Sequence, residues 1–394
     1  MNKKNWLIKN KNLLYALLIM PFLQPFIFNE YPVVDKVYLS LKILSAIVIF
    51  LLFFLKILYK KIHISKFIYF IFLYSFILII STIFNHSSIE RCTSYVIPIV
   101  CLILLTEMWM DIDSKKFLKF VGSIFSIYVI INLFTVIFCP VIFADFSETV
   151  SSRYYFLGED NRFIFVMLPL IYVLVVRDLM NNNKINYSTI LIYFICLLTL
   201  VYRWSVAAMI GVLLIGISLL LKKFKHLKLN IYHIYAIVAF IYTAIVVFKL
   251  HYKLLPLFDM LFNKRQTLES RYMLWDLCIG YIASNPIIGY GIQTIEVLKS
   301  KFIVSHSHNM FLQFTYETGF VGLIIYIALF LLVGKSIYKC ENKNITNFSA
   351  VVIFVILLLG IFDTLNHSYL FLLLFLIYKI NNDYKKANGG VNND

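Results

Sequence analysis

The residues best suited to chemistry lie together between positions 269 and 322. Basic, aromatic, glycine and imidazole side chains gather there, in the order Arg271, Trp275, Asn285-Pro286, Gly289-Tyr290-Gly291, His306, His308, Asn309, Gln313 and Glu317. An imidazole exchanges a proton near neutral pH, and the planar fork of arginine binds phosphate or carboxylate. The cluster therefore predicts a site that binds an anion and moves a proton.

His308 and Asn309 stand at the start of an apolar run over 309–334. The positive end of a helix dipole favours a neutral, proton-accepting histidine, so His308 is a candidate general base. A structural hydrogen bond is the commoner role of a lone interfacial histidine. Asn309, Gln313 and Glu317 repeat at four-residue intervals and form a polar stripe, which predicts a wet cavity or a polar partner helix.

Arg271 and Trp275 are four residues apart on a helix expected over 270–283, which ends at Asn285-Pro286. Phosphate and a sugar could be held side by side on that face. A headgroup-level tryptophan beside a membrane-anchoring arginine is the alternative. The helix belongs to a predicted loop over 250–307, whose apolar stretch 252–262 suggests a helix lying on the membrane surface.

Composition places this cluster in a membrane protein. The chain has 394 residues, of which 61% are hydrophobic and 14% charged, so it cannot form a water-soluble surface. We expect an all-α, polytopic single domain over 1–394 with about twelve transmembrane helices, because lipid offers backbone groups no other partner. The twelve apolar runs cover residues 13–28, 37–58, 67–84, 94–110, 117–138, 162–177, 187–202, 205–221, 231–249, 309–334, 347–362 and 366–379.

The placement of the net charge of +16 argues against nucleic acid as a partner and for a membrane topology. Lysine marks alternate loops from the N-terminus onward, which places both termini in the cytoplasm. Arginine falls mostly on the other side. An external arginine set suggests an anionic ligand there, although Arg91 and Arg265 also suit headgroup anchoring.

A second polar region lies in the predicted external loop over 139–161. Carboxylates, arginines and tyrosines combine there, as they do in sugar sites, and the candidate substrate contacts are Arg153, Glu159, Asp160 and Arg162. An interfacial loop with an aromatic belt explains the composition equally well. Arg203 lies in the tight turn between runs 187–202 and 205–221, where it needs an anion: a ligand phosphate, or a carboxylate such as Glu159 or Asp160.

Metal and disulfide motifs are weak in this sequence. Asp111-Ile112-Asp113 resembles a metal-binding DxD, but helix capping by Asp113 and its neighbours is the simpler explanation. The six cysteines show no CxxC spacing and suggest neither a metal site nor a disulfide framework. We expect no metal and no cofactor.

The spacing R-x3-W, N-P-x2-G-x-G and H-N-x3-Q-x3-E-x-G, carried by residues 271–319, resembles the O-antigen ligase and Wzy-type polysaccharide polymerase family. The resemblance is specific over about 269–322, weaker at Arg203 and at Asn161-Arg162, and topological elsewhere. It implies a GT-C-like helical fold and a metal-independent glycosyltransferase. The donor would be a glycan on undecaprenyl diphosphate, handled outside the cytoplasmic membrane. Arg203 and Arg271 would bind the diphosphate, and His308 would act on the acceptor hydroxyl.

Between the activities in this family, we favour a polysaccharide polymerase that joins lipid-linked repeat units of capsule, exopolysaccharide or O-antigen. A ligase that moves a finished glycan to another acceptor is the first alternative. A polysaccharide flippase or exporter is the second, and the nearly charge-free span interiors argue against it. Expected partners are the lipid-linked oligosaccharide and membrane lipid, together with a flippase and a chain-length regulator.

Overall fold

The structure, a computed structural model, describes residues 3–59, 64–138, 154–221, 229–250, 256, 259–260, 265–365 and 367–389. These residues form helices and connecting turns, and no β-strand occurs among them, as an all-α prediction requires. The longer helices are α1 Lys3–Ile19, α2 Pro32–Leu58, α3 Lys66–Phe84, α4 Ile89–Phe138, α5 Phe163–Asn182, α6 Tyr187–Tyr202, α7 Val206–Leu221, α8 Ile231–Tyr242, α10 Arg265–Ser284, α11 Ile295–Phe302, α12 Met310–Lys339, α13 Lys343–Phe362 and α14 Ser368–Gly389.

Among the described residues, each of the twelve apolar runs lies mainly in helical segments. Among the described residues, six helices are long and apolar enough to cross a membrane: α2, α3, α4, the segment Asp160–Asn182 that includes α5, α12 and α13. Three shorter apolar helical segments cover Tyr187–Tyr202, Val206–Leu220 and Ile231–Val247. The chain is therefore a multi-pass membrane protein of helical type. The number of crossings and the side on which the termini lie stay predictions.

Two of the expected spans differ in detail from the structure. The first, 13–28, is not one helix: α1 ends at Ile19 and is followed by two short 3-10 segments, Met20–Leu23 and Phe26–Glu30. Pro21 and Pro25 explain the break, because proline donates no backbone hydrogen bond and clashes with the preceding helical turn.

Runs 94–110 and 117–138 are joined in the 50-residue helix α4, whose backbone is interrupted at Asp113. The Oδ1 atom of Asp113 accepts a hydrogen bond from the backbone N–H of Lys116 at 3.0 Å. This is the geometry of a helix N-cap, so the capping interpretation of Asp113 is confirmed.

The chain divides into two compact units. The first comprises Met1–Ile68, Ile97–Val212 and His367–Leu373. Within it, α5 packs against α6 and α1 against α2. Nearly every residue of α5 between 163 and 179 is buried, which makes this helix the centre of the unit. The single transmembrane domain expected over 1–394 stays a prediction.

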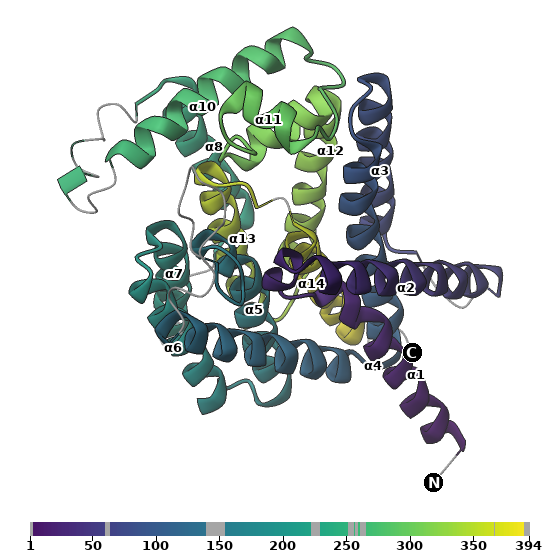
Figure 1. The fold of residues 1–394 in the computed structure, drawn as a ribbon. Helices are drawn as coiled ribbons and strands as arrows, with labels where there is room; N and C mark the ends of the chain where they lie inside the picture. Colours follow the sequence, from purple (N-terminus) through teal and green to yellow (C-terminus); the bar gives the residue numbers. More distant parts are fainter. Residues whose placement is uncertain are drawn as a thin grey trace. The chain divides into compact units, whose positions relative to one another are not determined.

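The second unit comprises Tyr69–Val96, Leu213–Asn366 and Leu374–Asp394. Figure 1 shows α10 and α11 beside α12, and α12 in turn packs against α13 and α8. Helix α10 confirms the helix expected over 270–283 and its end before Asn285-Pro286. The expected surface helix over 252–262 lies almost entirely outside the described residues, as does Arg153 with most of the loop 139–161.

Candidate functional site

Helix α12 is broken at Gly319, and the segment that follows α10 fills the break. Gly319 has φ 65° and ψ −169°, which is outside the helical region. The backbone N–H of Phe320 donates to the carbonyl of Pro286 at 2.7 Å, and the N–H of Gly291 donates to the carbonyl of Glu317 at 2.9 Å. Residues 286–291 therefore replace the helical hydrogen bonds that the break removes, as buried backbone inside a membrane requires.

This contact explains the first glycine of the N-P-x2-G-x-G spacing and the glycine of the H-N-x3-Q-x3-E-x-G spacing. Gly289 has φ 69°, and a Cβ atom there would lie 2.5 Å from the backbone nitrogen of Gly319. Gly319 has φ 65°, and its Cβ would collide with the carbonyl of Ile287. Only glycine combines a positive φ with so close an approach of two backbones. The tight turn therefore brings its backbone against α12, where the sequence alone suggested a ligand.

Helix α3 holds the same junction from a second side. Ser81 Oγ donates to the carbonyl of Glu317 at 2.8 Å, and Asn85 Nδ2 donates to the carbonyl of Gly289 at 2.9 Å. The first turns of α12, from Asn309 to Glu317, are thus fixed by segments from two other parts of the chain. This matters because those turns carry the candidate site.

His308 is held tightly through its backbone. Its φ of 50° is in the left-handed region, and its neighbours Ser307 and Asn309 are fully buried. Asn309 caps α12 by accepting a hydrogen bond from the N–H of Leu312 at 3.0 Å. The indole nitrogen of Trp275 donates to the carbonyl of His308 at 3.3 Å. Left-handed backbone at a non-glycine residue is unfavourable, and it concentrates at functional sites where the surroundings enforce it.

The side chain of His308 faces a carboxylate at the end of α13. Its Nδ1 atom lies 3.3 Å from Oδ1 of Asp363, which also accepts the backbone N–H of Thr364 at 2.8 Å. Arg271 donates to the carbonyl of Phe362, and its Nη2 atom lies 3.9 Å from Oδ2 of Asp363. Burial alone would raise the pKa of Asp363, but the hydrogen bond of His308 and the charge of Arg271 outweigh it and lower the pKa to about 2.

This pairing defines what the imidazole can do. An ionised carboxylate beside Nδ1 favours the tautomer that carries the proton on Nδ1, which leaves Nε2 of His308 as a proton acceptor. The same carboxylate stabilises the imidazolium that forms after proton transfer. The pair of His308 and Asp363 has the geometry that an oriented general base requires, and Arg271 places a positive charge next to it. The catalytic role of His308 stays a prediction.

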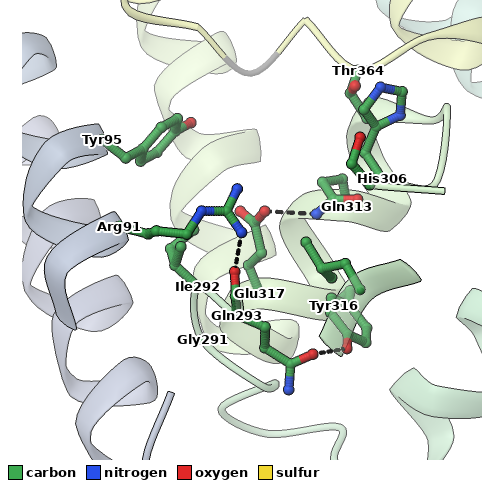
Figure 2. Close-up of a pocket in the computed structure, with 12 residues that line it drawn as sticks. Arg91, Tyr95, Gly291, Ile292, Gln293, His306, Gln313, Tyr316, Glu317 and Thr364 are labelled. Atoms are coloured by element: carbon green, nitrogen blue, oxygen red, sulfur yellow. Dashed lines mark hydrogen bonds between the residues drawn. The ribbon is translucent and has the colours of Figure 1, made fainter. Parts of the chain in front are cut away.

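A cavity of about 190 Å³ adjoins this base. It is lined by side chains that include Arg91, Gln293, His306, Gln313, Tyr316 and Glu317. The rings of His306 and His308 are in edge contact with centroids 4.1 Å apart, so the cavity reaches the immediate neighbour of the base. Figure 2 shows the Arg91 guanidinium and the Glu317 carboxyl pointing toward one another inside it.

Comparison with known proteins shows a similarity to one family over part of the chain. Residues 188–327 match the O-antigen ligase family. The match covers about a third of the chain. The matched range contains three residues that the sequence singled out, Arg203, Arg271 and His308, whereas Asp363 and Arg91 lie beyond its ends. The family-level resemblance proposed from the spacing over 269–322 is confirmed.

Two curated relatives carry names of candidate polysaccharide ligases. One, from Rickettsia conorii, is 28% identical over 182 residues, which cover 42% of this chain and 43% of that protein. The other, from Rickettsia typhi, is 24% identical over 190 residues, which cover 45% of each. The chain thus aligns with less than half the length of the curated relatives it matches. These names favour the ligase-type alternative, and the polymerase stays a prediction.

Arg203, within the matched range, and Asp160, before it, meet in the first unit. Arg203 Nε donates to Asp160 Oδ1 at 2.8 Å and Nη2 to Oδ2 at 2.9 Å, a two-pronged ion pair. The hydrogen bonds to Asp160 raise the pKa of Arg203 further. Arg203 is therefore paired with Asp160, one of the two carboxylates suggested for it. The other, Glu159, has its Oε2 atom 3.9 Å from Nε of Arg162. Diphosphate binding by Arg203 stays a prediction.

Trp275 and Asn309, also expected to bind substrate, have structural contacts. Trp275 is 2% exposed and packs against Tyr272 and Phe362. Asn309 is fully buried, where Nδ2 donates to the carbonyl of Ile361 at 3.0 Å. Both residues position the loop that carries His308, and their expected contact with substrate stays a prediction.

One group among the described residues has the geometry of a metal site. The ligand atoms of His306, His308 and Asp363 all lie within 4.8 Å of one another, and two imidazoles with a carboxylate are a ligand set used for zinc. Arg271 supplies a competing positive partner 3.9 Å from the same carboxylate, which disfavours a divalent cation. A metal-free reaction at this group stays a prediction and is tested below.

Sequence reasoning missed Asp363 and undervalued Arg91. Asp363 follows directly after the apolar run 347–362, and a carboxylate at the mouth of a span was the signal that could have drawn attention to it. Arg91, a candidate headgroup anchor from sequence, donates to the carbonyl of Gln293 and lines the cavity. Only the fold brings these residues to a histidine or a glutamate more than 50 positions away.

Proposed function

We propose that this protein transfers a glycan from a polyprenyl diphosphate carrier to an acceptor hydroxyl, outside the cytoplasmic membrane, in the manner of an O-antigen ligase. The observation that carries the proposal is the His308–Asp363 pair with Arg271 beside it. The match of residues 188–327 to the ligase family supports the reaction class.

The reaction can be assigned to the residues as follows. The acceptor O–H bond breaks, and the proton passes to Nε2 of His308, whose Nδ1 faces Asp363. The acceptor oxygen forms a bond to the anomeric carbon of the donor sugar. The bond between that carbon and the diphosphate oxygen breaks, and the polyprenyl diphosphate leaves with the electron pair.

Arginine provides the charge that the leaving group needs. Arg271 has five N–H donors, and its hydrogen bond to the carbonyl of Phe362 uses one of them. Donors on the same fork can therefore bind a diphosphate oxygen beside the base. Electrostatic stabilisation of this kind substitutes for the divalent cation of nucleotide-sugar enzymes. Holding donor and acceptor at one site lowers the barrier further by orientation.

The test is a comparison of surface and lipid-linked glycans in cells that lack the gene. The deletion strain is complemented with wild type, His308→Ala, Arg271→Ala or the matched surface variant His233→Ala, which lies at an exposed position on α8, and membrane levels of each are measured. We expect the deletion to leave full-length glycan on its carrier, with restoration by wild type and His233→Ala only.

Each other outcome has a definite meaning. Single repeat units on the carrier would establish the polymerase that the sequence favoured. Lipid-linked repeats confined to the cytoplasmic leaflet would establish the flippase. Full restoration by both His308→Ala and Arg271→Ala at normal membrane levels would overturn the site, whatever the reaction is.

A further inference from the structure

The cavity beside His306 contains a carboxylate oxygen that the fold does not satisfy. Glu317 is 8% exposed, and its Oε1 atom accepts a hydrogen bond from Gln313 Nε2 at 2.7 Å. Its Oε2 atom is buried and has no hydrogen-bond partner among the described residues. Leaving such an acceptor unpaired costs about 1–3 kcal/mol, so the cavity is built to receive a hydrogen-bond donor.

The charges of the lining decide the class of ligand. The side chains of Arg91 and Glu317 both point into the cavity. The negative charge of the Glu317 carboxylate disfavours binding of a diphosphate, and the positive charge of the Arg91 guanidinium disfavours binding of a metal cation. The other polar groups of the lining include the amides of Gln293 and Gln313 and the hydroxyl of Tyr316. Such a lining suits an uncharged ligand rich in hydroxyl groups.

The size and position of the cavity limit which ligand it can hold and which side of the site that ligand approaches. Its volume of about 190 Å³ is below the range of roughly 300–1,000 Å³ that drug-sized ligands occupy, and it therefore suits one sugar ring. Arg271, the candidate for the donor diphosphate, does not line it, whereas His306 does and lies against His308. A ring in the cavity thus approaches the proton-accepting side of the site.

We propose that this cavity is the acceptor subsite and holds one neutral, hydroxyl-bearing sugar ring, with Glu317 Oε2 accepting a hydroxyl hydrogen bond. The ring's role as an acceptor rests on the proposed function. Glu317 positions the ring, and Arg91 donates hydrogen bonds to its oxygens. An acidic sugar is disfavoured by Glu317.

The first experiment measures binding, which requires no turnover. The full chain in detergent is titrated with methyl hexopyranosides, methyl N-acetylhexosaminides and methyl hexuronosides, and the thermal midpoint is followed. We expect saturable stabilisation by at least one neutral glycoside, and about tenfold weaker affinity in Glu317→Gln because the hydrogen bond accepted by Oε2 is lost. The isosteric amide keeps an oxygen for Gln313.

The controls separate the cavity from its surroundings. Glu296→Gln is the matched change at an exposed position of α11 and should bind as wild type does. Ser305→Leu fills the cavity from a loop and should abolish binding even if Glu317→Gln is poorly folded. Binding that is equal in wild type, Glu317→Gln and Ser305→Leu would overturn the proposal, and so would absence of binding by every neutral glycoside.

The second experiment asks whether the bound ring is an acceptor. The glycoside that binds is added to wild-type membranes containing lipid-linked glycan, and its glycosylation is measured. We expect a glycosylated product, a raised KM for the glycoside in Glu317→Gln, and an unchanged KM for the donor. Transfer to the native acceptor without any transfer to the glycoside would overturn the acceptor assignment alone. Binding without any transfer at all would instead contradict the proposed function.

Discussion

The Nδ1 atom of His308 lies 3.3 Å from Oδ1 of Asp363, although the two residues are 55 positions apart in the chain. The loop before α12 supplies the histidine, and the end of α13 supplies the carboxylate. Helices α12 and α13 pack against each other, so the contact is a consequence of their pairing. Arg271 reaches the same carboxylate from α10. Three helices therefore meet at one carboxylate.

Asp363→Asn should lower kcat by about 10²–10⁴-fold with little change in the KM for donor, because the amide no longer fixes the tautomer of His308 or stabilises its protonated form. Steady-state transfer at varied donor concentration measures this split. Asp276→Asn, the same change at a side chain that is 46% exposed, is the control and should retain full activity. A rise in KM alone would assign Asp363 to substrate binding.

The ion pairs of Asp363 should also make the stability of the fold depend on pH. The pKa of this carboxyl is lowered from 3.8 to about 2, so its stabilising contribution is complete above about pH 4 and is lost as the pH falls through about 2. Asp363→Asn should therefore lower the thermal midpoint at about pH 5 by more than it does at about pH 2.5. An equal difference at both pH values would show that the carboxylate gains nothing from its partners.

Gly319→Ala should greatly reduce the folded level of the protein in membranes. A Cβ atom at this position collides with the carbonyl of Ile287, and φ of 65° is unfavourable for alanine. Gly280→Ala is the matched control on α10, where nothing lies within 4 Å of the added Cβ, and it should be neutral or stabilising by up to about 1 kcal/mol. Comparable levels of the two variants would contradict the tight junction between residues 286–291 and α12.

The Arg203–Asp160 pair lends itself to a double-mutant cycle. Asp160→Asn and Arg203→Gln should each destabilise the fold by about 1 kcal/mol, and the double variant should cost little more than either, because both remove one partly buried ion pair. Transfer activity should fall much further in Arg203→Gln than in Asp160→Asn, since only the former removes the charge expected to bind diphosphate. Equal losses of activity would restrict Arg203 to a structural role.

Removal of divalent cations should leave transfer unchanged. The group formed by His306, His308 and Asp363 could hold an ion, but Arg271 already balances the carboxylate. Activity is measured in membranes treated with EDTA and then with added Zn²⁺ or Mg²⁺. Loss with the chelator and recovery with one of the ions would show that the group is a metal site and that His308 is a ligand.

Several features were determined by the sequence alone. Hydrophobic run length is a local property, so among the described residues each of the twelve runs from 13–28 to 366–379 lies mainly in helical segments, and the helix carrying Arg271 ends before Asn285-Pro286 as its proline dictates. Pro21 and Pro25 could also be read from the sequence. We nevertheless expected one span over 13–28, whereas these prolines end the first helix within it. The spacing around His308 was sufficient to indicate the ligase family, because those residues are close along the chain.

The tertiary structure decided which residues act together. The glycines at 289 and 291 looked like a turn that could approach a ligand, and the fold places Gly289 against the break at Gly319 and Gly291 against Thr82 of α3. The partners of Asp363 and Arg91 could not be identified from the sequence, because they lie in distant segments of the chain. A side chain acquires such a role through packing between distant segments, which spacing along one helix cannot encode.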